Sequence, residues 1–335
     1  MLARVWQMKA FDFHRAHDVD DALAVAGTTG GSYYAGGTNL LDLMKLGVTQ
    51  PSSLIDIGRL GLDEITATDS GGVLIGSGVT NSAIANHHLI RTRYPVLSHA
   101  ILSGATTQLR NMATAGGNLM QRTRCPYFMD VTFRACNKRR PGSGCAALDG
   151  FNREHALFGA SRSCVAVHPS DMAVALAILD AVVHVQSREG ARSIALSEFF
   201  QLPQDHPEQD NALSPGELIV GVELPPSEYA FHSWYLKVRD RHSYAFALVS
   251  VAVGMTIDDG IVTSAALALG GVAARPWRSP DAEAVLVGNV ADITTFGRAA
   301  EVAMNGASPL SQNQFKVDLA KHSIVRTLHM AATRR

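Results

Sequence analysis

In the first part of the chain, apolar and polar positions change in short blocks that predict strands alternating with helices. The blocks with strand-like spacing are Phe11–Phe13, Ser32–Ala35 and Leu54–Ile57, and those with helix-like spacing run through Asp20–Ala26 and onward from Leu40. Strands that alternate with helices at this spacing are typical of an α/β unit. We therefore expect a small α/β subdomain at residues 8–64.

The same periodicities continue beyond this unit until a pair of prolines. The expected strands are the run VLIGSG (73–78), a strand from Val165, Val182–Gln186 and Glu217–Leu224, and the expected helices lie near Ser82–Asn86, around Pro95–Ser103 and at Met172–Leu179. Because proline cannot donate to a sheet ladder, Pro225–Pro226 indicates the end of this part. We expect one domain at residues 8–228, made of subdomains 8–64 and 65–228.

From about Ala230 the pattern predicts a second, C-terminal α+β domain at residues 229–335. Three runs are strand-like: WYLKVRD (234–240), FALVSVAVGMTI (246–257) and IVTSAALALGGV (261–272). Asp258-Asp259-Gly260 joins the last two and is a hairpin signal. Helices are expected at Pro280–Leu286, Asp292–Ala303 and Gln312–Ala332.

Composition narrows the classes of partner. The 335 residues are 47% hydrophobic and 18% charged, with 29 basic and 30 acidic residues and a formal net charge of −1. This balance leaves no electrostatic footprint for nucleic acid or an anionic membrane. No stretch reaches the roughly 18 consecutive apolar residues of a membrane span. The first residues carry neither a secretory signal nor a twin-arginine pair, and we interpret residues 1–7 as a short extension before Met8.

Two glycine pairs share one sequence pattern. Gly36-Gly37 and Gly116-Gly117 each follow an alanine and precede small polar residues. Paired glycines let a backbone approach a ligand closely, and N–H groups at a helix start bind phosphate without a lysine. A single Gly-Gly pair is usually ordinary turn chemistry, but two with the same pattern favour a shared pyrophosphate ligand. Neither pair matches GxGxxG or a Walker loop, which disfavours a Rossmann site and an ATPase.

All four cysteines lie within one irregular stretch, which we call the insert (residues 121–165). Their spacing is Cys-x10-Cys-x8-Cys-x18-Cys, and so long a stretch without periodicity is usually functional or disordered. Four thiolates suit a tetrahedral zinc or a [4Fe–4S] cluster. The lack of a CxxC pair weakens the zinc interpretation, and the basic residues Lys138, Arg139 and Arg140 could offset an anionic cage. Free or disulfide-bonded cysteines are the third alternative.

Four runs carry a resemblance to a known family. AGGTNLLDLMK, LRNMATAGGNL, HPSD and YLKVRDRHSYAFALVSVA resemble, in that order, the flavin and C-terminal domains of the xanthine dehydrogenase family of molybdenum hydroxylases. The resemblance extends from Met8 to the final helix and is strong for the separate FAD subunits of bacterial periplasmic aldehyde oxidoreductases. It implies an α+β fold: a two-part FAD-binding domain of the vanillyl-alcohol-oxidase (PCMH) type, followed by a small α+β domain with a three-stranded antiparallel sheet and helices.

The resemblance also implies which residues bind FAD. Those matching the pyrophosphate loop are Ser32, Tyr33, Tyr34, Ala35, Gly36, Gly37, Thr38, Asn39 and Leu40, and those matching the opposite wall are Thr114, Gly117, Asn118 and Leu119, the last near the isoalloxazine. Asp171 matches a position that binds flavin hydroxyls, Ile219 an apolar flavin contact and Lys237 a polar contact near the ring. By residue type alone, Asp171 is as well interpreted as a helix cap, Lys237 as a solvated charge and Ile219 as core.

For the insert, the resemblance implies that Cys125, Cys136, Cys145 and Cys164 ligate one [4Fe–4S] cluster. For the whole chain it implies an electron-transfer subunit of a heterotrimer that is not active on aldehyde alone. The partners would be a large molybdopterin-binding subunit, a small subunit with two [2Fe–2S] clusters, and a terminal acceptor (oxygen, ferredoxin or a quinone-linked carrier). The expected location is the periplasm, by co-export with a signal-bearing partner, with the cytoplasm as the alternative.

The sequence supplies no catalytic acid or base to set against this interpretation. With 13 histidines in the chain, no Ser–His–Asp or HExxH pattern appears, and we assign no catalytic residue. Two other functions stay open. One is a stand-alone FAD-dependent oxidase of the same flavin fold, and the other is a zinc-bearing assembly scaffold without redox chemistry.

Overall fold

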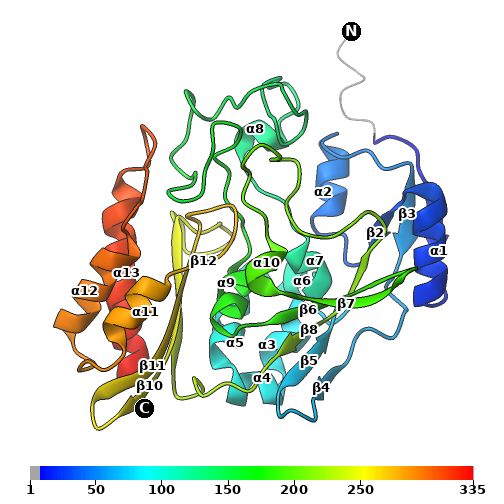
Figure 1. Ribbon diagram of the computed structural model, residues 1–335. Helices are drawn as coiled ribbons and strands as arrows, with labels where there is room; N and C mark the ends of the chain where they lie inside the picture. The colour runs from blue at the N-terminus through cyan, green and yellow to red at the C-terminus, as the bar shows by residue number, and fades with distance from the viewer. Residues whose placement is uncertain (1–7, 335) are drawn as a thin grey trace.

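The computed structural model describes residues 8–334 and arranges them as three sheets with their helices (Figure 1). A small N-terminal unit and a C-terminal sheet flank the central unit, and the insert lies at one end of the assembly. The expected α+β class is confirmed. The extension predicted at residues 1–7 falls outside the described residues.

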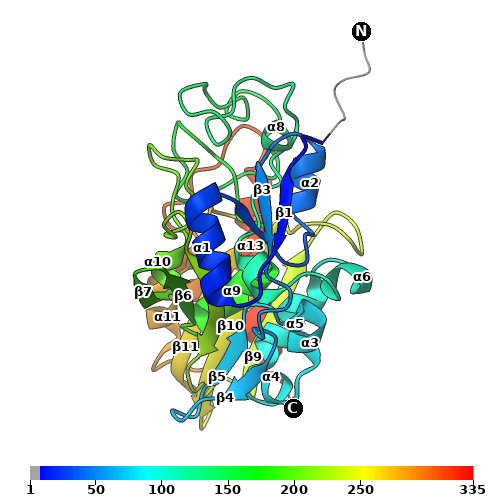
Figure 2. The same ribbon diagram turned by 90° about the vertical axis from the view of Figure 1, so that its right-hand side faces the viewer.

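The N-terminal unit has a parallel sheet in the order β1-β3-β2, and Figure 2 looks onto it. Its elements are β1 (Asp12–Arg15), α1 (Val19–Thr29), β2 (Ser32–Tyr34), α2 (Leu40–Lys45) and β3 (Ser53–Asp56). Helix α1 begins where the Asp18 side chain accepts a bond from the Asp21 N–H, and it ends at Gly30, whose φ is 62°. Its alanines Ala22 and Ala26 pack with Ile55 of β3. The predicted alternation of strands and helices is confirmed.

The central unit contains an antiparallel sheet in the order β4-β5-β8-β6-β7. Its strands are β4 (Ile65–Ala67), β5 (Val73–Gly76), β6 (Val182–Ser187), β7 (Gly190–Ala195) and β8 (Leu218–Leu224). Its helices are α3 (Asn81–Asn86), α4 (His88–Arg93), α5 (Pro95–Ser103), α6 (Thr107–Arg110), α7 (Ala115–Leu119), α9 (Asp171–Ile178) and α10 (Leu196–Phe199).

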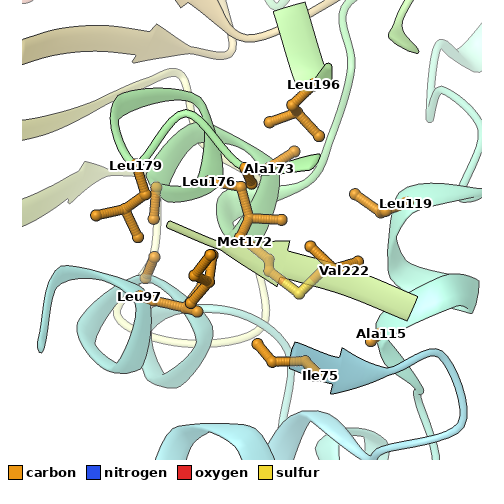
Figure 3. Packing of buried hydrophobic residues seen from close by; sticks show 14 of the residues in the cluster. Ile75, Leu97, Ala115, Leu119, Met172, Ala173, Leu176, Leu179, Leu196 and Val222 are labelled. Atoms are coloured by element: carbon orange, nitrogen blue, oxygen red, sulfur yellow. The ribbon is translucent and has the colours of Figure 1, made fainter. Parts of the chain in front are cut away.

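Helix α9 lies at the centre of the main core. All of Met172–Leu176 is buried, because α9 packs against α5 on one side and against the C-terminal strands on the other. Figure 3 shows Met172 and Leu176 in the same cluster as Val222. A helix covered on all sides is apolar all round, which explains its sequence. Helix α9 therefore connects the central unit to the C-terminal sheet.

The strand predicted from Val165 is wrong. The segment is extended and largely buried, but it forms no ladder with a neighbouring strand. Single backbone bonds hold it: the Ala156 N–H donates to the Val165 carbonyl, and the His168 N–H donates to the carbonyl of Ala273. An apolar run that is buried without sheet pairing looks like a strand in sequence alone.

The C-terminal sheet has the order β12-β11-β10-β9, so the predicted three strands become four. Its elements are β9 (His232–Val238), β10 (Val249–Asp258), β11 (Ile261–Gly270), β12 (Trp277–Arg278), α11 (Pro280–Leu286), α12 (Ile293–Ala303) and α13 (Phe315–Ala332). Strand β12 was missed because two residues show no periodicity. The predicted hairpin is confirmed: Asp259 and Gly260 have φ values of 47° and 79°, as a two-residue turn of this type requires.

The insert has little regular structure. It contains only α8 (Pro126–Met129) and an isolated bridge that pairs Cys136 with Cys145. Phe128 and Cys136 pack on Leu43 of α2, and the Lys316 ammonium of α13 donates to the carbonyls of His155 and Gly271. The insert is thus fixed to both the first and the last parts of the fold. No helix within residues 8–334 is long and apolar enough to cross a membrane.

Candidate functional site: two glycine turns and a cysteine cavity

The two glycine turns meet face to face. Gly36 follows β2, and a side-chain carbon added there would lie 1.8 Å from the carbonyl oxygen of Met112, just before the second turn. Gly37 has a φ of 68°, in the left-handed region that favours glycine. In the second turn, Thr114 caps α7 by accepting a bond from the Gly117 N–H at 3.2 Å. Only glycine at position 36 allows this approach.

The turns open onto a cavity of about 840 Å³, which we call the flavin cavity. Ile219 of β8 and the loop 208–217 complete its lining. The predicted residues that line it are Ser32, Tyr33, Ala35, Gly36, Gly37, Thr38, Asn39, Leu40, Thr114, Gly117 and Ile219.

A second cavity of about 580 Å³ adjoins the first and shares Thr38, Asn39 and Gly117 with it. It adds three further predicted residues, Asn118, Asp171 and Lys237. The structure thus brings together residues that are up to two hundred positions apart in the chain. Two predicted residues line neither cavity: Tyr34 packs edge-on against Phe13, and Leu119 lies in the main core (Figure 3).

Some residues that line these cavities have buried polar atoms without a partner. The side-chain nitrogen of Asn39, the hydroxyl of Ser77 and the side-chain oxygen of Asn81 are buried, and none has a hydrogen-bond partner among the described residues. All three residues line one cavity or the other. Buried polar groups without partners are costly, so their presence indicates a polar ligand. Donors, acceptors and glycine backbone together fit a dinucleotide with hydroxyl and phosphate groups.

Asp171 and Lys237 form a buried ion pair at the second cavity. The Lys237 ammonium lies 2.7 Å from one Asp171 oxygen, and the Tyr235 hydroxyl donates to the other at 2.6 Å. The Lys237 side chain is only 3% exposed, so the interpretation as a solvated charge is wrong. Ser170, whose hydroxyl accepts from the Ala173 N–H, is the N-cap of α9, so the cap interpretation of Asp171 is wrong as well.

Sequence reasoning missed a wall of the flavin cavity. Arg122 and Asp210 both line it, and the Arg122 Nε donates to the Asp210 carboxylate at 2.6 Å. The Arg122 backbone N–H donates to the Asn39 side chain at 2.8 Å, which fixes the first glycine turn. Arg122 had a local signal, as a basic residue just after the second turn. Asp210 had none, because it lies in a polar loop far along the chain.

The rim of the second cavity is formed by residues outside the predicted binding set. Arg241, Tyr244 and Phe246 line it from the loop between β9 and β10. The Arg241 guanidinium donates to the Tyr244 carbonyl, and the Arg124 guanidinium lies 5.1 Å from the centre of the Phe246 ring. The Asp240 carboxylate binds Arg153 of the insert through two bonds of 2.6 and 2.9 Å. The rim loop is therefore attached to the insert.

The four cysteines line one small cavity inside the insert, here called the cysteine cavity. None forms a disulfide, so the disulfide alternative is wrong. Burial raises the pKa of the Cys125 thiol to about 12 and also raises that of Cys164. Within residues 8–334, no three His, Cys, Asp or Glu side chains are arranged to hold a single metal ion. The four thiols line a shared cavity, but they do not converge on a single point at which one ion could bind.

Comparison with known proteins places these features in a family. Residues 9–227 match the FAD-binding domain in molybdopterin dehydrogenase, and residues 234–331 match the CO dehydrogenase flavoprotein C-terminal domain. The chain is 50% identical to the aldehyde oxidoreductase FAD-binding subunit PaoB of Escherichia coli (strain K12), over 96% of this chain and 98% of that one. It is 25% identical to the carbon monoxide dehydrogenase medium chain of Afipia carboxidovorans, over 97% and 98%.

Solved structures have the same fold. A chain of quinoline 2-oxidoreductase from Pseudomonas putida 86 has a TM-score of 0.76 at 25% identity, covering 97% of this chain and 98% of that one. A chain of a Cu,Mo-CO dehydrogenase has a TM-score of 0.77 at 23% identity, covering 98% and 100%. The likeness therefore extends over both domains.

Proposed function

Because the chain belongs to the family of FAD-binding proteins of molybdopterin dehydrogenases, we propose that it is the FAD-binding, electron-transferring subunit of a molybdenum-dependent aldehyde oxidoreductase. The observation that carries the proposal is the meeting of two glycine turns on one cavity that unpartnered polar side chains also line. Oxidation of one aldehyde with water to the acid releases two electrons and two protons. The residues that line the two cavities would hold FAD, which would supply the redox chemistry that links this release to a terminal acceptor.

The residues around the cavities have distinct proposed roles. Backbone N–H groups of the first turn hold the pyrophosphate, and the second turn forms the wall opposite to it. Asn39 and Ser77 supply a donor and a hydroxyl to its oxygens, because both have free capacity. Asp171 accepts hydrogen bonds from flavin hydroxyls, and the ion pair with Lys237 fixes the position of the Asp171 carboxylate. The predicted contacts of Tyr34 and Leu119 act through packing, since neither residue lines the flavin cavity or the second cavity.

We extend the proposal to a [4Fe–4S] cluster held by Cys125, Cys136, Cys145 and Cys164. Support comes from the donor set: four free thiols line one cavity, in a segment with a single short helix. A cluster is wider than one ion, so its ligands stand further apart than a zinc site requires. Bound there, it would exchange electrons one at a time.

The proposal for the partners rests on the relatives, which carry the names of medium chains and FAD-binding subunits. We propose a heterotrimer with a large molybdopterin-binding subunit and a small subunit with two [2Fe–2S] clusters. Its terminal acceptor is oxygen, ferredoxin or a quinone-linked carrier.

The flavin assignment is tested with Gly117→Val. A side-chain carbon at Gly117 would lie 3.1 Å from the Thr114 hydroxyl and within 4 Å of no other atom beyond its chain neighbours and the helix backbone, so only this hydroxyl has to shift, by a few tenths of an ångström, while the valine methyl groups occupy the shared wall of both cavities. We expect folded protein with little FAD, measured by the flavin absorbance per chain and by circular dichroism. The matched control is Gly297→Val on α12, where no atom lies within 4 Å. Full flavin content in Gly117→Val would refute the site.

The absorption spectrum of the purified chain separates this function from its two rivals. Flavin bands with a broad iron–sulfur shoulder support the proposal. Flavin bands alone, together with aldehyde oxidation by the isolated chain, would support a stand-alone oxidase. A chain with zinc and no visible bands would support an assembly scaffold.

Location in the periplasm stays a prediction, with the cytoplasm as its alternative. We propose export of the folded, loaded chain together with a signal-bearing partner. Fractionation of cells with and without the small subunit tests this: the chain should move to the cytoplasm when the partner is deleted. A chain that stays in the periplasm alone rules out co-export, and a cytoplasmic chain in intact cells rules out export.

A further inference from the structure

A network of three charged residues lies between the flavin cavity and the cysteine cavity. The Asp210 carboxylate accepts from the Arg122 guanidinium at 2.6 Å through one oxygen and from the Lys138 ammonium at 2.5 Å through the other. The Lys138 side chain is 6% exposed, whereas those of Arg122 and Asp210 are 26% and 28% exposed. The two cations keep the pKa of Asp210 low against the effect of its burial. The network holds two positive charges and one negative charge.

One end of the network belongs to the flavin cavity. Arg122 lines that cavity, and its backbone N–H binds the Asn39 side chain of the first glycine turn. The same guanidinium lies 4.8 Å from the centre of the Phe128 ring, which packs on Cys136. Arg122 is therefore fixed in place by groups from both sites.

The other end belongs to the cysteine cavity. Lys138 lines that cavity, and its ammonium also donates to the Pro207 carbonyl at 2.5 Å. Its charge lowers the pKa of the Cys164 thiol, partly offsetting the effect of burial. The neighbouring basic residues do not share this position, because Arg139 donates to the carbonyls of Tyr127 and Phe133, and Arg140 is exposed. Lys138 is the one of the three that lies between the thiols and Asp210.

We propose that Lys138 raises the reduction potential of the cluster bound by the four cysteines, and that Asp210 is the positioning residue that holds and partly neutralises it. This inference rests on the proposed cluster. A positive charge near a thiolate-ligated cluster favours its reduced, more negative form, and net charge is among the factors that set such potentials. Since Asp210 does not itself line the cysteine cavity, its own effect on the potential is the smaller one.

Substitutions at the two ends of one ion pair then have opposite effects. Lys138→Met removes a positive charge and should shift the cluster potential downward. Asp210→Asn removes the negative charge, leaves both cations, and should shift it upward by a smaller amount. The double variant has the net charge of the original network and should return toward the original potential. A purely structural role predicts no such sign reversal, because both single changes would loosen the same contacts.

The experiment is a redox titration of the intact complex, followed by electron paramagnetic resonance of the cluster and by flavin absorbance, with iron counted per chain. Lys321→Met is the matched control, because Lys321 forms a comparable ion pair with Glu301 on the exposed side of the C-terminal domain. Where Lys138→Met loses iron, Lys138→Gln makes the same charge change and keeps a donor for Asp210.

The outcomes separate this inference from the assignment it rests on. Opposite shifts in the two single variants support it. Wild-type complex without iron in this subunit overturns both the cluster and the inference. About four irons per complex in addition to the four of the two [2Fe–2S] clusters, with unmoved potentials or with shifts in one common direction, overturns the inference and leaves the cluster standing.

Discussion

Asp171 and Lys237 show how a charged pair can be structural and still belong to the site. Both residues line the second cavity, and the Tyr235 hydroxyl donates a hydrogen bond to the second oxygen of the Asp171 carboxylate. Burial and the adjacent carboxylate hold the pKa of Tyr235 well above its ordinary value, so the phenol remains a donor. The carboxylate is thereby oriented before any ligand arrives.

Lys237→Met should therefore destabilise the protein strongly. Removing one partner of a buried pair leaves an uncompensated charge, which costs about 3–5 kcal/mol. The comparison variant Lys321→Met breaks an exposed pair and should cost at most about 1 kcal/mol. Urea unfolding of both variants measures the difference. An equal loss of the free energy of unfolding in Lys237→Met and Lys321→Met would show that the Asp171 carboxylate is not buried as described.

His168, in the HPSD turn, predicts a pH dependence. Its two ring nitrogens are buried without partners among the described residues, its ring packs against Phe200, and desolvation lowers its pKa to about 4. The unfolded chain, with an ordinary value near 6.5, then binds more protons than the folded one between pH 4 and 6.5. Stability from this group is present above pH 6.5 and is lost as pH falls toward 4.

His168→Phe keeps the ring contact with Phe200 but removes the titrating group. Between pH 6.5 and pH 4, the free energy of unfolding of the variant should fall by about 2 kcal/mol less than that of wild type. Thermal unfolding across this range is the measurement, with His88→Phe at an exposed position as control. Parallel pH profiles for His168→Phe and wild type would contradict the prediction.

At the scale of elements, local signals decided what could be predicted. Helix α5 agrees with its prediction at both ends, since Pro95 opens it and Gly104 follows it. Strand β7 was missed because it is exposed along most of its length and shows no apolar alternation. Helix α7 was missed because AGGNL has the composition of a turn. Residues such as Asp210 enter the site through long-range pairing alone, which no local pattern encodes.

The insert is the element whose order should depend most on its cofactor. A ligand set that spans residues 125–164 restrains a segment with one short helix and few buried apolar side chains. Cys136→Ser should remove about four irons per chain and leave most of the flavin bound. Hydrogen exchange should then quicken across 125–164, while α9 stays protected.

The control for this comparison is Arg162→Ala, an exposed change within the same segment. It should retain iron and the exchange pattern of wild type. Unchanged iron in Cys136→Ser, or zinc in place of iron, would be incompatible with the cluster assignment.

At the scale of the whole molecule, the fold joins two units that could not form the site separately. Helix α9 carries Asp171 from the flavin unit, and β9 carries Lys237 and Tyr235 from the C-terminal sheet. The insert adds Arg122 to one wall and holds the rim loop through Arg153. The general fold could be inferred from sequence because the two glycine turns and the β9–β10 strand pair are local motifs. The cavity walls between these motifs could not be inferred in this way.

The same architecture predicts what the isolated chain can do. It holds the flavin cavity, and the proposed function assigns aldehyde oxidation to a partner subunit, so its chemistry should stop at electron exchange. With FAD bound, it should be reduced by a chemical reductant and reoxidised by an artificial acceptor, and it should show no aldehyde-dependent reduction. Adding both proposed partners should restore that reduction through a permanent interface, above about 2,000 Å² in total. Aldehyde oxidation by the chain alone, at the rate of the whole complex, would overturn its assignment as a relay.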